Sequence, residues 1–518
     1  MNRNHNLPGK LNIWQVSREM APFAEAGGIK DVVAGLSRAL SKDHHNVTVV
    51  IPMYKSLQRF RKNTPLLEYE LNFKHFIERI QVYKIEHNNL RVLFISASCF
   101  SSKEQVYTYS LNEELENSNF TYGSGHHDRD LMNLLLQRST LETAFRLGEA
   151  PHLFHLHDGH CGFLPAIMKS EKKFGDFFKK TGSLLTIHNA GIAYQQNIAD
   201  TNTALDLTGL PLSLLKGIEL EYGYSPLICA GLFGHINTVS EQYAKDIMAG
   251  RDSSSGVLGF AFKKKGIQLY GITNGIDIQQ FRGSHFKHGL HSDSFSCDFL
   301  HKENCKRTLF KRLNDMRKEE YVFGNLNNDV HIPLITIQSR ITYQKGIDIF
   351  IDSMKILADK NIKANFLVIG EGEKAYESSL TQLASTLDNF CYIRKYDFEL
   401  SQHLFAAGDF FLIPSRWEPC GLTDFIAQLF GNIPIVHETG GLVKTENLKN
   451  GFSYKMNKGE TLSLKIFEVV DLYFTNSSIL HNIQKNAVNI INEKYTWEKV
   501  LAERYLPLYK KISKKNLQ

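Results

Sequence analysis

Two series of short, apolar, β-rich runs alternate along the chain with stretches of helical amphipathic pattern. Several runs are nearly continuous in apolar residues, which is typical of parallel strands buried on both faces. Such alternation predicts βαβ units, and two series predict two doubly wound parallel sheets in an α/β chain. The first series is Leu11–Ser17, Val47–Pro52, Leu153–His157, Leu184–His188 and Ile236–Ser240, and the second is Leu334–Ser339, Phe366–Gly370, Phe410–Pro414 and Ile433–His437.

The chain has 518 residues, more than one hydrophobic core usually organises, so two domains are expected. We place the passage between them near Gln268. Beyond it, Phe281–Asp329 is rich in Ser, His, Asn and Lys and contains one helix-like piece, Lys302–Leu313. The last helical pattern, Trp497–Lys511, could belong to either domain on its pattern alone.

Charge and cysteine content argue against several classes of protein. The 60 basic and 54 acidic residues leave a net charge of +6 without the basic stripe typical of nucleic-acid binders. The seven cysteines are scattered and form no C-x-x-C pair, so they indicate neither a disulfide framework nor a zinc site. No segment reaches the roughly 18 apolar residues that a membrane span requires. We therefore expect a cytoplasmic protein whose partners are neither nucleic acid nor membrane.

A glycine pair follows the first predicted strand. The sequence A-E-A-G-G-I-K-D-V (24–32) leads from that strand into a helix and contains Gly27 and Gly28. Paired glycines let the backbone approach a ligand closely, and the exposed N–H groups of a helix start favour phosphate oxygens. Such a turn is structural about as often as it is functional, so this motif alone decides nothing.

Histidines and a carboxylate gather at the end of the next strand, in H-L-H-D-G-H (155–160). A metal site is one interpretation, but no cysteine or Glu-x-x-His pattern completes a ligand set. We favour a strand end that presents Asp158 and His160 to a polyhydroxy ligand. The following strand ends similarly, in T-I-H-N-A, which adds His188 and Asn189. The acidic triplet at 128–130 precedes a helical pattern, and we interpret it as a helix start.

The second half carries cations and glycines at its strand ends. S-R-I-T-Y-Q-K-G (339–346) contains Arg340 and Lys345, a fork and a point charge that together suit a diphosphate. P-S-R-W-E-P-C-G-L (414–422) places Glu418 where strand gives way to helix. E-T-G-G-L (438–442) adds a second glycine pair suited to anion contact. Ligands bind beyond the carboxyl ends of parallel strands, so all these motifs belong to one predicted cleft.

In order and spacing, these segments resemble those of bacterial glycogen synthases and plant starch synthases. The matching elements are E-A-G-G-I-K-D-V, H-x-H-D-x-H-x-G, T-x-H-N, N-G-I-D, S-R-I-T-Y-Q-K-G, P-S-R-W-E-P-C-G-L-T and T-G-G-L. The resemblance implies a retaining glucosyltransferase of the GT-B fold that elongates α-1,4-glucan from a nucleotide glucose, ADP-glucose in particular. It implies no cofactor and no metal, because side-chain cations would serve the leaving group.

The same resemblance divides the chain into a first domain, 1–268 with 494–518, and a nucleotide-sugar-binding domain, 269–493. The final helix would cross back onto the first domain, which would contact the acceptor. There, Asp158 and His188 would hold the transferred glucose near the reacting carbon. Asn274 would help order the site at the domain interface.

In the second domain, the resemblance implies that Arg340 and Lys345 neutralise the departing diphosphate. Glu418 would contact sugar hydroxyls and support an oxocarbenium-like transition state. The turn formed by Thr439, Gly440 and Gly441 would donate backbone N–H groups to phosphate. Further candidates within these motifs are Glu25, Lys30, His160, Asn189, Cys420 and Gly421.

Three departures from the family pattern concern the donor. Glu25 stands where the family has a lysine that contacts phosphate, and a carboxylate repels a diphosphate in a low-dielectric cleft. Either Glu25 turns away, or another cation such as Lys30 compensates, or the donor binds differently. Gly159 replaces a tryptophan, and D-F-I (424–426, ending in Ile426) replaces Gln-Leu-Tyr.

Two alternatives therefore stay open. One is a hexosyltransferase of the same fold that uses UDP-glucose or another donor or acceptor. The other is a non-catalytic glucan-binding or regulatory protein, which Glu25 and Gly159 would favour. The five retained polar residues Asp158, His188, Arg340, Lys345 and Glu418 oppose it, because a protein without catalysis has little reason to keep them all.

Overall fold

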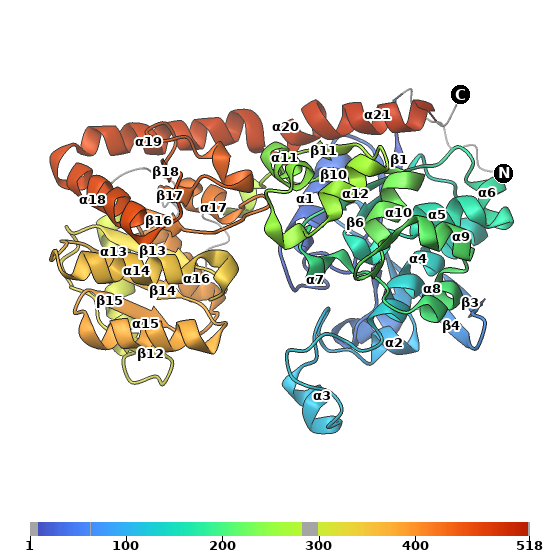
Figure 1. Ribbon diagram of the computed structural model, residues 1–518, viewed down its shortest axis with the longest axis horizontal. Helices are drawn as coiled ribbons and strands as arrows, with labels where there is room; N and C mark the ends of the chain where they lie inside the picture. The colour runs from blue at the N-terminus through green and yellow to red at the C-terminus, as the bar shows by residue number, and fades with distance from the viewer. Residues whose placement is uncertain (1–8, 63, 282–298, 516–518) are drawn as a thin grey trace. The chain divides into compact units, whose positions relative to one another are not determined.

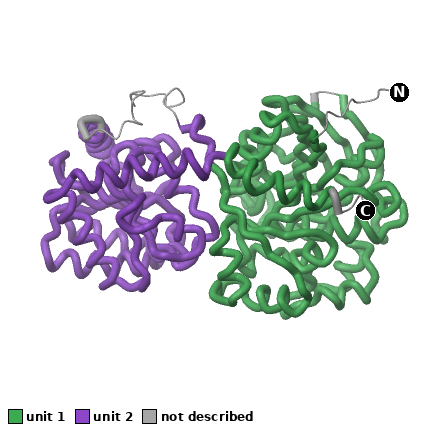
Figure 2. The backbone as a smooth tube through the Cα atoms, turned by 90° about the horizontal axis from the view of Figure 1, so that it is seen from above, with its two compact units in different colours: residues 1–275, 497–518 green, residues 276–496 purple. Residues whose placement is uncertain are grey.

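The computed structural model describes residues 9–62, 64–281 and 299–515. Its contacts divide the chain into two compact units, one of residues 1–275 with 497–518 and the other of residues 276–496 (Figure 2). The boundaries expected from the sequence are after residue 268 and before residue 494. In the structure the two units meet after Gly275 and before Trp497. Residues 282–298 of the polar passage Phe281–Asp329 lie outside the described residues.

The first unit is built on a nine-stranded sheet in the order β11-β10-β7-β6-β1-β2-β5-β4-β3 (Figure 1). Its strands pair in parallel, except that β4 is antiparallel to both β5 and β3. The strands are β1 Asn12–Val16, β2 Asn46–Pro52, β3 Leu67–Asn72, β4 Ile77–His87, β5 Leu90–Ser96, β6 Leu153–His157, β7 Gly182–Ile187, β10 His235–Thr238 and β11 Leu269–Gly271, with a separate pair of β8 Glu219–Leu220 and β9 Gly223–Tyr224.

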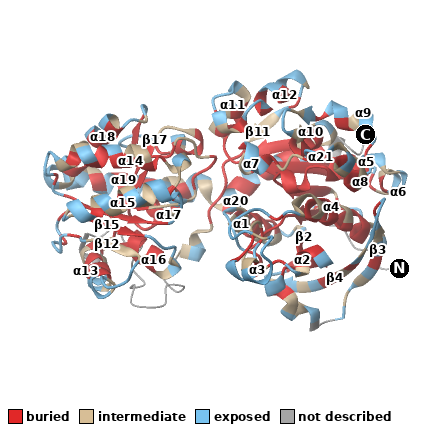
Figure 3. Ribbon diagram, turned by 60° about the horizontal axis from the view of Figure 1, so that its bottom comes forward, coloured by how far each residue is buried: buried red, intermediate tan, exposed pale blue. Residues whose placement is uncertain are grey.

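Burial along the central strands explains why their sequences are so apolar. Every residue of β6 and β7 is buried, and so are the last six residues of β2 (Figure 3). Because successive side chains of a strand point to opposite faces, continuous burial means that both faces of the sheet are covered. The two doubly wound sheets expected from the sequence are confirmed.

Helices cover this sheet and connect its strands. They are α1 Ile29–Lys42, α2 Ser98–Ser101, α3 Leu111–Glu116, α4 Arg129–Arg146, α5 Leu164–Ser170, α6 Lys172–Phe177, α7 Ile192–Gln195, α8 Thr201–Thr208, α9 Leu212–Gly217, α10 Pro226–Phe233, α11 Glu241–Ala249, α12 Leu258–Lys264, α20 Trp497–Val500 and α21 Leu506–Lys515. The acidic triplet 128–130 begins α4, as expected, with Asp128 at the N-cap position and Asp130 in the first turn. Lys103 pairs with Asp128 at 3.0 Å.

The second unit contains a seven-stranded sheet in the order β12-β15-β14-β13-β16-β17-β18, in which only the edge strand β12 is antiparallel to its neighbour. Its strands are β12 Val322–Gly324, β13 Leu334–Gln338, β14 Asn365–Ile369, β15 Phe390–Ile393, β16 Phe410–Ile413, β17 Ile433–His437 and β18 Phe452–Tyr454. Its helices are α13 Phe299–Asp315, α14 Ile347–Ala358, α15 Lys374–Thr386, α16 Phe398–Ala407, α17 Thr423–Leu429, α18 Gly459–Thr475 and α19 Ser477–Ile490.

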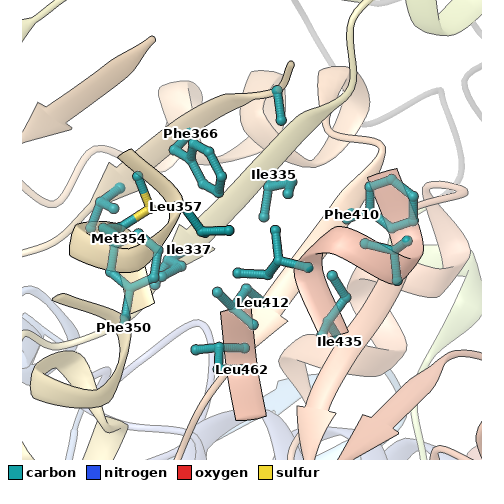
Figure 4. Packing of buried hydrophobic residues seen from close by; sticks show 14 of the residues in the cluster. Ile335, Ile337, Phe350, Met354, Leu357, Phe366, Phe410, Leu412, Ile435 and Leu462 are labelled. Atoms are coloured by element: carbon teal, nitrogen blue, oxygen red, sulfur yellow. The ribbon is translucent and has the colours of Figure 1, made fainter. Parts of the chain in front are cut away.

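One face of this second sheet packs on α14 and α18 to form a hydrophobic core. Ile335 and Ile337 of β13 contribute to it together with Phe350 of α14 and Leu462 of α18 (Figure 4). The helix expected at Lys302–Leu313 is confirmed within α13. This core holds the carboxyl ends of β13, β16 and β17 at one edge of the sheet, where the polar motifs of the second half follow.

The last helix of the chain fastens onto the first unit through Trp497. A Cβ added at Gly35 of α1 would overlap with the Trp497 indole, and one added at Gly275 would overlap with it too. Both contact positions therefore need glycine so that the indole can lie against backbone. Tyr509 of α21 reaches the sheet itself, because its hydroxyl lies 2.7 Å from Nδ1 of His155 on β6.

We predict that Gly35→Ala destabilises the first unit by about 1–3 kcal/mol, because the added methyl group overpacks the helix against the Trp497 indole. Chemical unfolding measures this loss. Gly217→Ala is the matched control, since a Cβ there meets no atom within 4 Å. Equal unfolding free energies for the two variants would show that Trp497 does not hold the terminal helix in place.

Candidate active site

Asp158 lies directly after β6 and is the first polar group of the site in the first unit. Its backbone adopts φ 57°, a left-handed conformation that is uncommon for a residue with a side chain. The carboxylate is buried and its Oδ1 accepts the N–H of His188 at 2.6 Å. Burial raises the pKa of Asp158 to about 8, although backbone N–H groups of His188 and Asn189 oppose that shift. The two neighbouring strand ends are thus joined by one carboxylate.

The His188 ring is held by a chain of hydrogen bonds between buried polar side chains of β6, β1 and α1. Nε2 of His188 lies 3.0 Å from Nδ1 of His157, whose Nε2 lies 2.9 Å from Oε1 of Gln15. The Gln15 amide donates in turn to the Ser37 hydroxyl at 2.7 Å. Burial lowers the pKa of His188 to about 3, so the ring is neutral and its orientation depends on these hydrogen bonds.

A second chain of buried polar groups lies beside the first. Nε2 of His155 is 2.7 Å from the Thr186 hydroxyl, which donates to Oδ1 of Asn237 at 2.7 Å. The other ring nitrogen of His155 contacts Tyr509, and burial lowers the pKa of His155 to about 3. The strand histidines are therefore internal hydrogen-bonding groups. Among the described residues, no three His, Cys, Asp or Glu side chains are grouped so that they could hold a metal ion.

The remaining candidate residues of the H-x-H-D-x-H and T-x-H-N motifs also contact other groups of the protein. His160 is buried and stacks on Tyr107, with ring centroids 5.1 Å apart. Oδ1 of Asn189 accepts the Gly191 N–H at 2.9 Å. At Gly159, a Cβ would overlap with the carbonyl of Gln195, so α7 fills the space beside Asp158 and a larger residue does not fit.

The glycine turn before α1 is held by a carboxylate that the sequence reasoning missed. Oε2 of Glu19 accepts the N–H groups of Ala26 at 3.0 Å and Gly27 at 2.7 Å, and its Oε1 accepts the Tyr107 hydroxyl at 2.9 Å. The Gly27 N–H is therefore occupied. The Gly28 N–H has no acceptor within the described part of the chain, and Gly28 is exposed. Glu19 lies three residues after the end of β1 at Val16, and this position near a strand end is the only signal that could have identified it.

Glu25 pairs with a lysine of the same turn. Its Oε2 lies 2.9 Å from Nζ of Lys30, which also lies 3.4 Å from Oδ1 of Asp31. Of the three alternatives that the sequence left open for Glu25, this geometry fits compensation by Lys30. A ligand phosphate at this turn would meet a neutralised carboxylate and not a bare one.

Asn274 closes the polar set of the first unit. It is buried, and its Oδ1 has no hydrogen-bond partner within the residues that the structure describes. A buried oxygen without a protein partner can accept a hydrogen bond from water or from a ligand. Thr273 beside it donates its hydroxyl to Oε2 of Glu241 at 2.6 Å, which fixes the segment.

In the second unit, the loops after β13 and β16 meet through an ion pair. Nζ of Lys345 lies 2.6 Å from Oε2 of Glu418, and both side chains are largely buried. The Ser415 hydroxyl donates to the same carboxylate oxygen at 3.2 Å. Two residues singled out from separate motifs thus contact each other directly, and any anion that binds Lys345 must compete with Glu418.

Arg340 extends from the same loop into solvent. It donates to Oε1 of Gln344 at 3.3 Å and pairs with no carboxylate in 299–515 or the earlier described ranges. By contrast, the Arg416 guanidinium already has partners within the protein. It forms a bidentate ion pair with Asp348 and lies 3.7 Å from the centroid of the Tyr343 ring. Arg340 is therefore the cation of these two loops that stays available to a ligand.

The second glycine pair serves a close approach between two loops. A Cβ at Gly440 would overlap with the Glu418 carbonyl, and one at Gly441 would overlap with the Cys420 carbonyl. The Gly441 N–H donates to that Glu418 carbonyl at 2.8 Å, and the Thr439 hydroxyl donates to the Arg416 carbonyl at 3.0 Å. The N–H that stays without an acceptor in the described residues is that of Gly440.

Cys420 and Gly421 lie against a lysine that the sequence reasoning did not single out. Nζ of Lys444 contacts the carbonyls of both residues and the carboxylate of Asp424. Asp424 belongs to the D-F-I departure, and Ile426 of the same stretch packs among apolar residues. The only available signal was that Asp424 places a charge in a segment that is otherwise apolar.

Comparison with known proteins follows the same division of the chain. The family model for the starch synthase catalytic domain matches residues 12–260. The model for glycosyl transferases group 1 matches residues 322–489. The glycogen synthase of Geotalea daltonii is 30% identical over 486 residues, which cover 89% of this chain and 92% of that protein.

This chain belongs to the glycogen synthase family. The glycogen synthase of Thermosipho melanesiensis is similar along its whole length, at 28% identity over 98% of this chain and 100% of that protein. The resemblance stated from the motifs is confirmed. The chain is a glycosyltransferase, and glucan elongation is the activity of its family.

Solved structures confirm the GT-B fold. The catalytic domain of starch synthase IV from Arabidopsis thaliana, bound to ADP and acarbose, matches with a TM-score of 0.78 at 22% identity, over 98% of this chain and 99% of that one. Sucrose-phosphate synthase from Thermosynechococcus elongatus matches with a TM-score of 0.58 at 14% identity, over 98% and 100% of the two chains. In the described part of this glycogen synthase family member, no helix is long and apolar enough to cross a membrane.

We predict that the first unit loses stability as the pH falls below about 6.5. Burial lowers the pKa values of five histidines. The pKa falls to about 4 for His126 and to about 3 for His155 and His188, and it lies well below the ordinary value for His157 and His160. Only the unfolded chain then takes up these protons, so each histidine removes up to about 1.4 kcal/mol per pH unit. Chemical unfolding between about pH 7 and pH 5 measures the slope.

A matched control for the acid series is His481→Gln, which replaces an exposed histidine of the second unit. Three carboxyls of the first unit, Asp158, Glu19 and Asp31, oppose the trend because burial raises their pKa values, but the five histidines outnumber them. An unfolding free energy that stayed level from about pH 7 to pH 5 would contradict the neutral state of the buried histidines.

We predict that Asp158→Asn stabilises the fold at alkaline pH while impairing activity. The folded carboxyl titrates near 8 and the unfolded one near its ordinary value, so the native chain loses stability as the pH rises through that window, by at most about 1.4 kcal/mol per pH unit. An asparagine oxygen can still accept the His188 N–H. The gain in unfolding free energy of Asp158→Asn over the unmodified chain should be larger at about pH 8.5 than at about pH 5, and Asp176→Asn, at an exposed carboxylate, is the control.

Proposed function

We propose that this chain elongates an α-1,4-glucan by retaining transfer of glucose from a nucleotide-glucose donor, ADP-glucose. The observation that carries the proposal is the pairing of Lys345 with Glu418, beside the ligand-accessible Arg340, at the carboxyl ends of β13 and β16. These are the groups that a departing diphosphate and a reacting sugar require. In the reaction, the bond from the sugar C1 to the diphosphate oxygen breaks, a bond from C1 to an acceptor hydroxyl oxygen forms, and the proton of that hydroxyl leaves with the departing nucleoside diphosphate.

The second unit serves the leaving group in this proposal. Cleavage leaves negative charge on the nucleoside diphosphate and positive charge on the sugar. Cations that are already in place at the developing negative charge lower the barrier, because no reorganisation is needed. Arg340 offers a planar fork for phosphate oxygens, and Lys345 adds a point charge. When phosphate engages Lys345, the Glu418 carboxylate is released toward the sugar hydroxyls and the developing cation.

The first unit serves the sugar in this proposal. Asp158 and His188 present a carboxyl and a neutral imidazole, joined by a 2.6 Å hydrogen bond to the His188 N–H. Because burial removes charge from both side chains near neutral pH, they suit hydroxyl groups better than phosphate. Asn274 adds a buried oxygen that has no partner in the described residues and could accept a ligand hydroxyl.

The choice of ADP-glucose rests on kinship and on the local charge balance. The solved starch synthase IV that shares this fold was bound to ADP and acarbose, a glucan-like ligand. Lys30 neutralises Glu25, so the changed turn need not repel a diphosphate. UDP-glucose as donor is the second candidate, and it is separated from the first by assay.

We assign the acceptor and sugar contacts to the first domain and the nucleotide-sugar contacts to the second. A cytoplasmic location fits the cysteines: the six that are described form no disulfide, and five of these are buried. Cys297 lies outside the described residues. Free buried thiols persist in a reducing compartment, where glutathione and thioredoxin oppose disulfide formation.

We predict that the purified chain transfers glucose to glycogen from ADP-glucose faster than from UDP-glucose, and that Glu418→Ala abolishes the transfer. Arg340→Ala should lower kcat by about 10²–10³-fold, as removal of one donor from a charge-stabilising site does. Initial rates with the two donors in parallel measure this. Arg307→Ala is the control, because Arg307 is exposed and belongs to none of the polar loops. Its guanidinium pairs with the Glu303 carboxylate at 3.7 Å.

The assay separates the competing functions. Faster transfer from UDP-glucose would replace the donor and leave the reaction class intact. Transfer from neither donor, together with measurable glucan binding, would favour the non-catalytic interpretation that Glu25 and Gly159 suggested. Equal rates for Arg340→Ala and the unmodified chain would contradict the assigned role of Arg340.

A further inference from the structure

Lys444 is a buried lysine at the junction of the two loops that carry Glu418 and the glycine pair. It ends the short helix η7, Gly440–Lys444, and its side chain is 5% exposed. Its ammonium contacts three backbone carbonyls and one carboxylate, namely Cys420 at 2.6 Å, Gly421 at 2.8 Å, Gly441 at 3.1 Å and Oδ2 of Asp424 at 2.9 Å. The ring of Phe425 lies 4.5 Å from the same Nζ.

These contacts leave the ammonium no capacity for a ligand. An ammonium group has three hydrogens, and four acceptors already surround this one. Asp424 is completely buried and supplies the negative charge that makes the burial tolerable. Burial nonetheless raises the pKa of Asp424, in spite of the lysine, so the pair lies in a strongly desolvated place. Lys444 therefore cannot act as a further phosphate-binding cation like Arg340.

The acceptors of Lys444 belong to the two loops that form the second half of the site. Cys420 and Gly421 directly follow Glu418 and Pro419, and Gly441 belongs to the T-G-G-L turn. The same loops are joined by the N–H of Gly441, which donates to the Glu418 carbonyl at 2.8 Å. The ammonium thus holds the backbone on both sides of the junction and, through it, the position of the Glu418 carboxylate beside Lys345.

A purely structural role would not require a buried ion pair. Well-packed apolar residues of similar volume are often as stabilising as a buried pair, or more so, because two charges need not be desolvated. What an ammonium adds is a point donor that holds three carbonyls in one arrangement. Such an arrangement matters where a reacting group must be held within about 0.5 Å of its productive position.

We propose that Lys444, with Asp424 as its counter-ion, is a positioning residue for glucose transfer that fixes the Glu418 loop against the glycine turn without contacting the donor. This inference rests on the proposed function and names a residue that acts behind its site. It requires that the loss of Lys444 lower kcat while donor affinity, which depends on Arg340 and Lys345, is retained.

The experiment compares Lys444→Met with Lys449→Met in the full chain. A displacement of about 1 Å at a reacting group lowers the rate by about a hundredfold, so Lys444→Met should lower kcat by that order. The KM for the nucleotide glucose and the Kd for the nucleoside diphosphate should each change less than threefold. A threefold change in Kd corresponds to about 0.6 kcal/mol of binding free energy. Lys449 is exposed, pairs with Glu446 at 2.8 Å and lies five residues away, so Lys449→Met should leave all three constants unchanged.

A double variant keeps the test decisive if Lys444→Met does not fold. Lys444→Gln with Asp424→Asn replaces the ion pair by two neutral amides of similar size, and the glutamine amide can still donate to two of the carbonyls. The kcat of the double variant should be lower than that of the unmodified chain and higher than that of Lys444→Met, where Lys444→Met folds and can be measured. The Kd for the diphosphate should again be unchanged. Calorimetry of diphosphate binding and initial rates supply the two readouts.

The outcomes separate this inference from the proposed function. An unchanged kcat in the folded double variant, with transfer by the unmodified chain, would overturn the role of Lys444 alone. A loss of diphosphate binding at unchanged kcat would make Lys444 part of the anion site and would overturn it as well. No transfer by the unmodified chain from either nucleotide glucose would overturn the proposed function and the inference together.

Discussion

Buried polar groups at the ends of parallel strands need hydrogen-bond partners, because an unpaired buried group costs free energy. This requirement shapes the first unit. Asp158 satisfies backbone N–H groups at the end of β7, and His188 is held through His157 and Gln15. Each polar side chain at the strand ends is thereby fixed in orientation as a condition of being buried at all. A different orientation of Asp158 or His188 would leave buried polar groups unpaired and would therefore cost free energy.

The central strands were predictable because they are short runs of mostly apolar residues. The strands β6, β7 and β13 are buried almost throughout because both faces of the sheet are covered. Strands β5 and β15 are almost as completely buried but were not among the predicted runs. Strand β4 escaped notice, since Ile77–His87 mixes buried and exposed residues near the sheet edge and reads as neither a buried strand nor a clear alternation. Strands β11, β12 and β18 have three residues each, too few for any period to show.

The site was predictable in its positions but not in its partners. Asp158, Arg340 and Glu418 follow predicted strands, and the topology of parallel sheets brings such residues to one edge. The groups that hold them come from distant sequence: Tyr509 reaches His155 across 354 residues, and Gln15 reaches His157 across 142. No spacing rule links residues so far apart, so these contacts become visible only in the folded chain.

Each departure from the family pattern meets a local compensation. Glu25 pairs with Lys30, the carbonyl of Gln195 fills the space beside Gly159, and Asp424 neutralises Lys444. Charge then follows the same division as the chemistry. Burial keeps Asp158 and His188 of the first unit uncharged near neutral pH, whereas Lys345 and Glu418 of the second unit form an ion pair. Under the proposed function a sugar and a diphosphate need these different environments, because hydroxyl groups suit neutral hydrogen-bonding partners and phosphates suit cations.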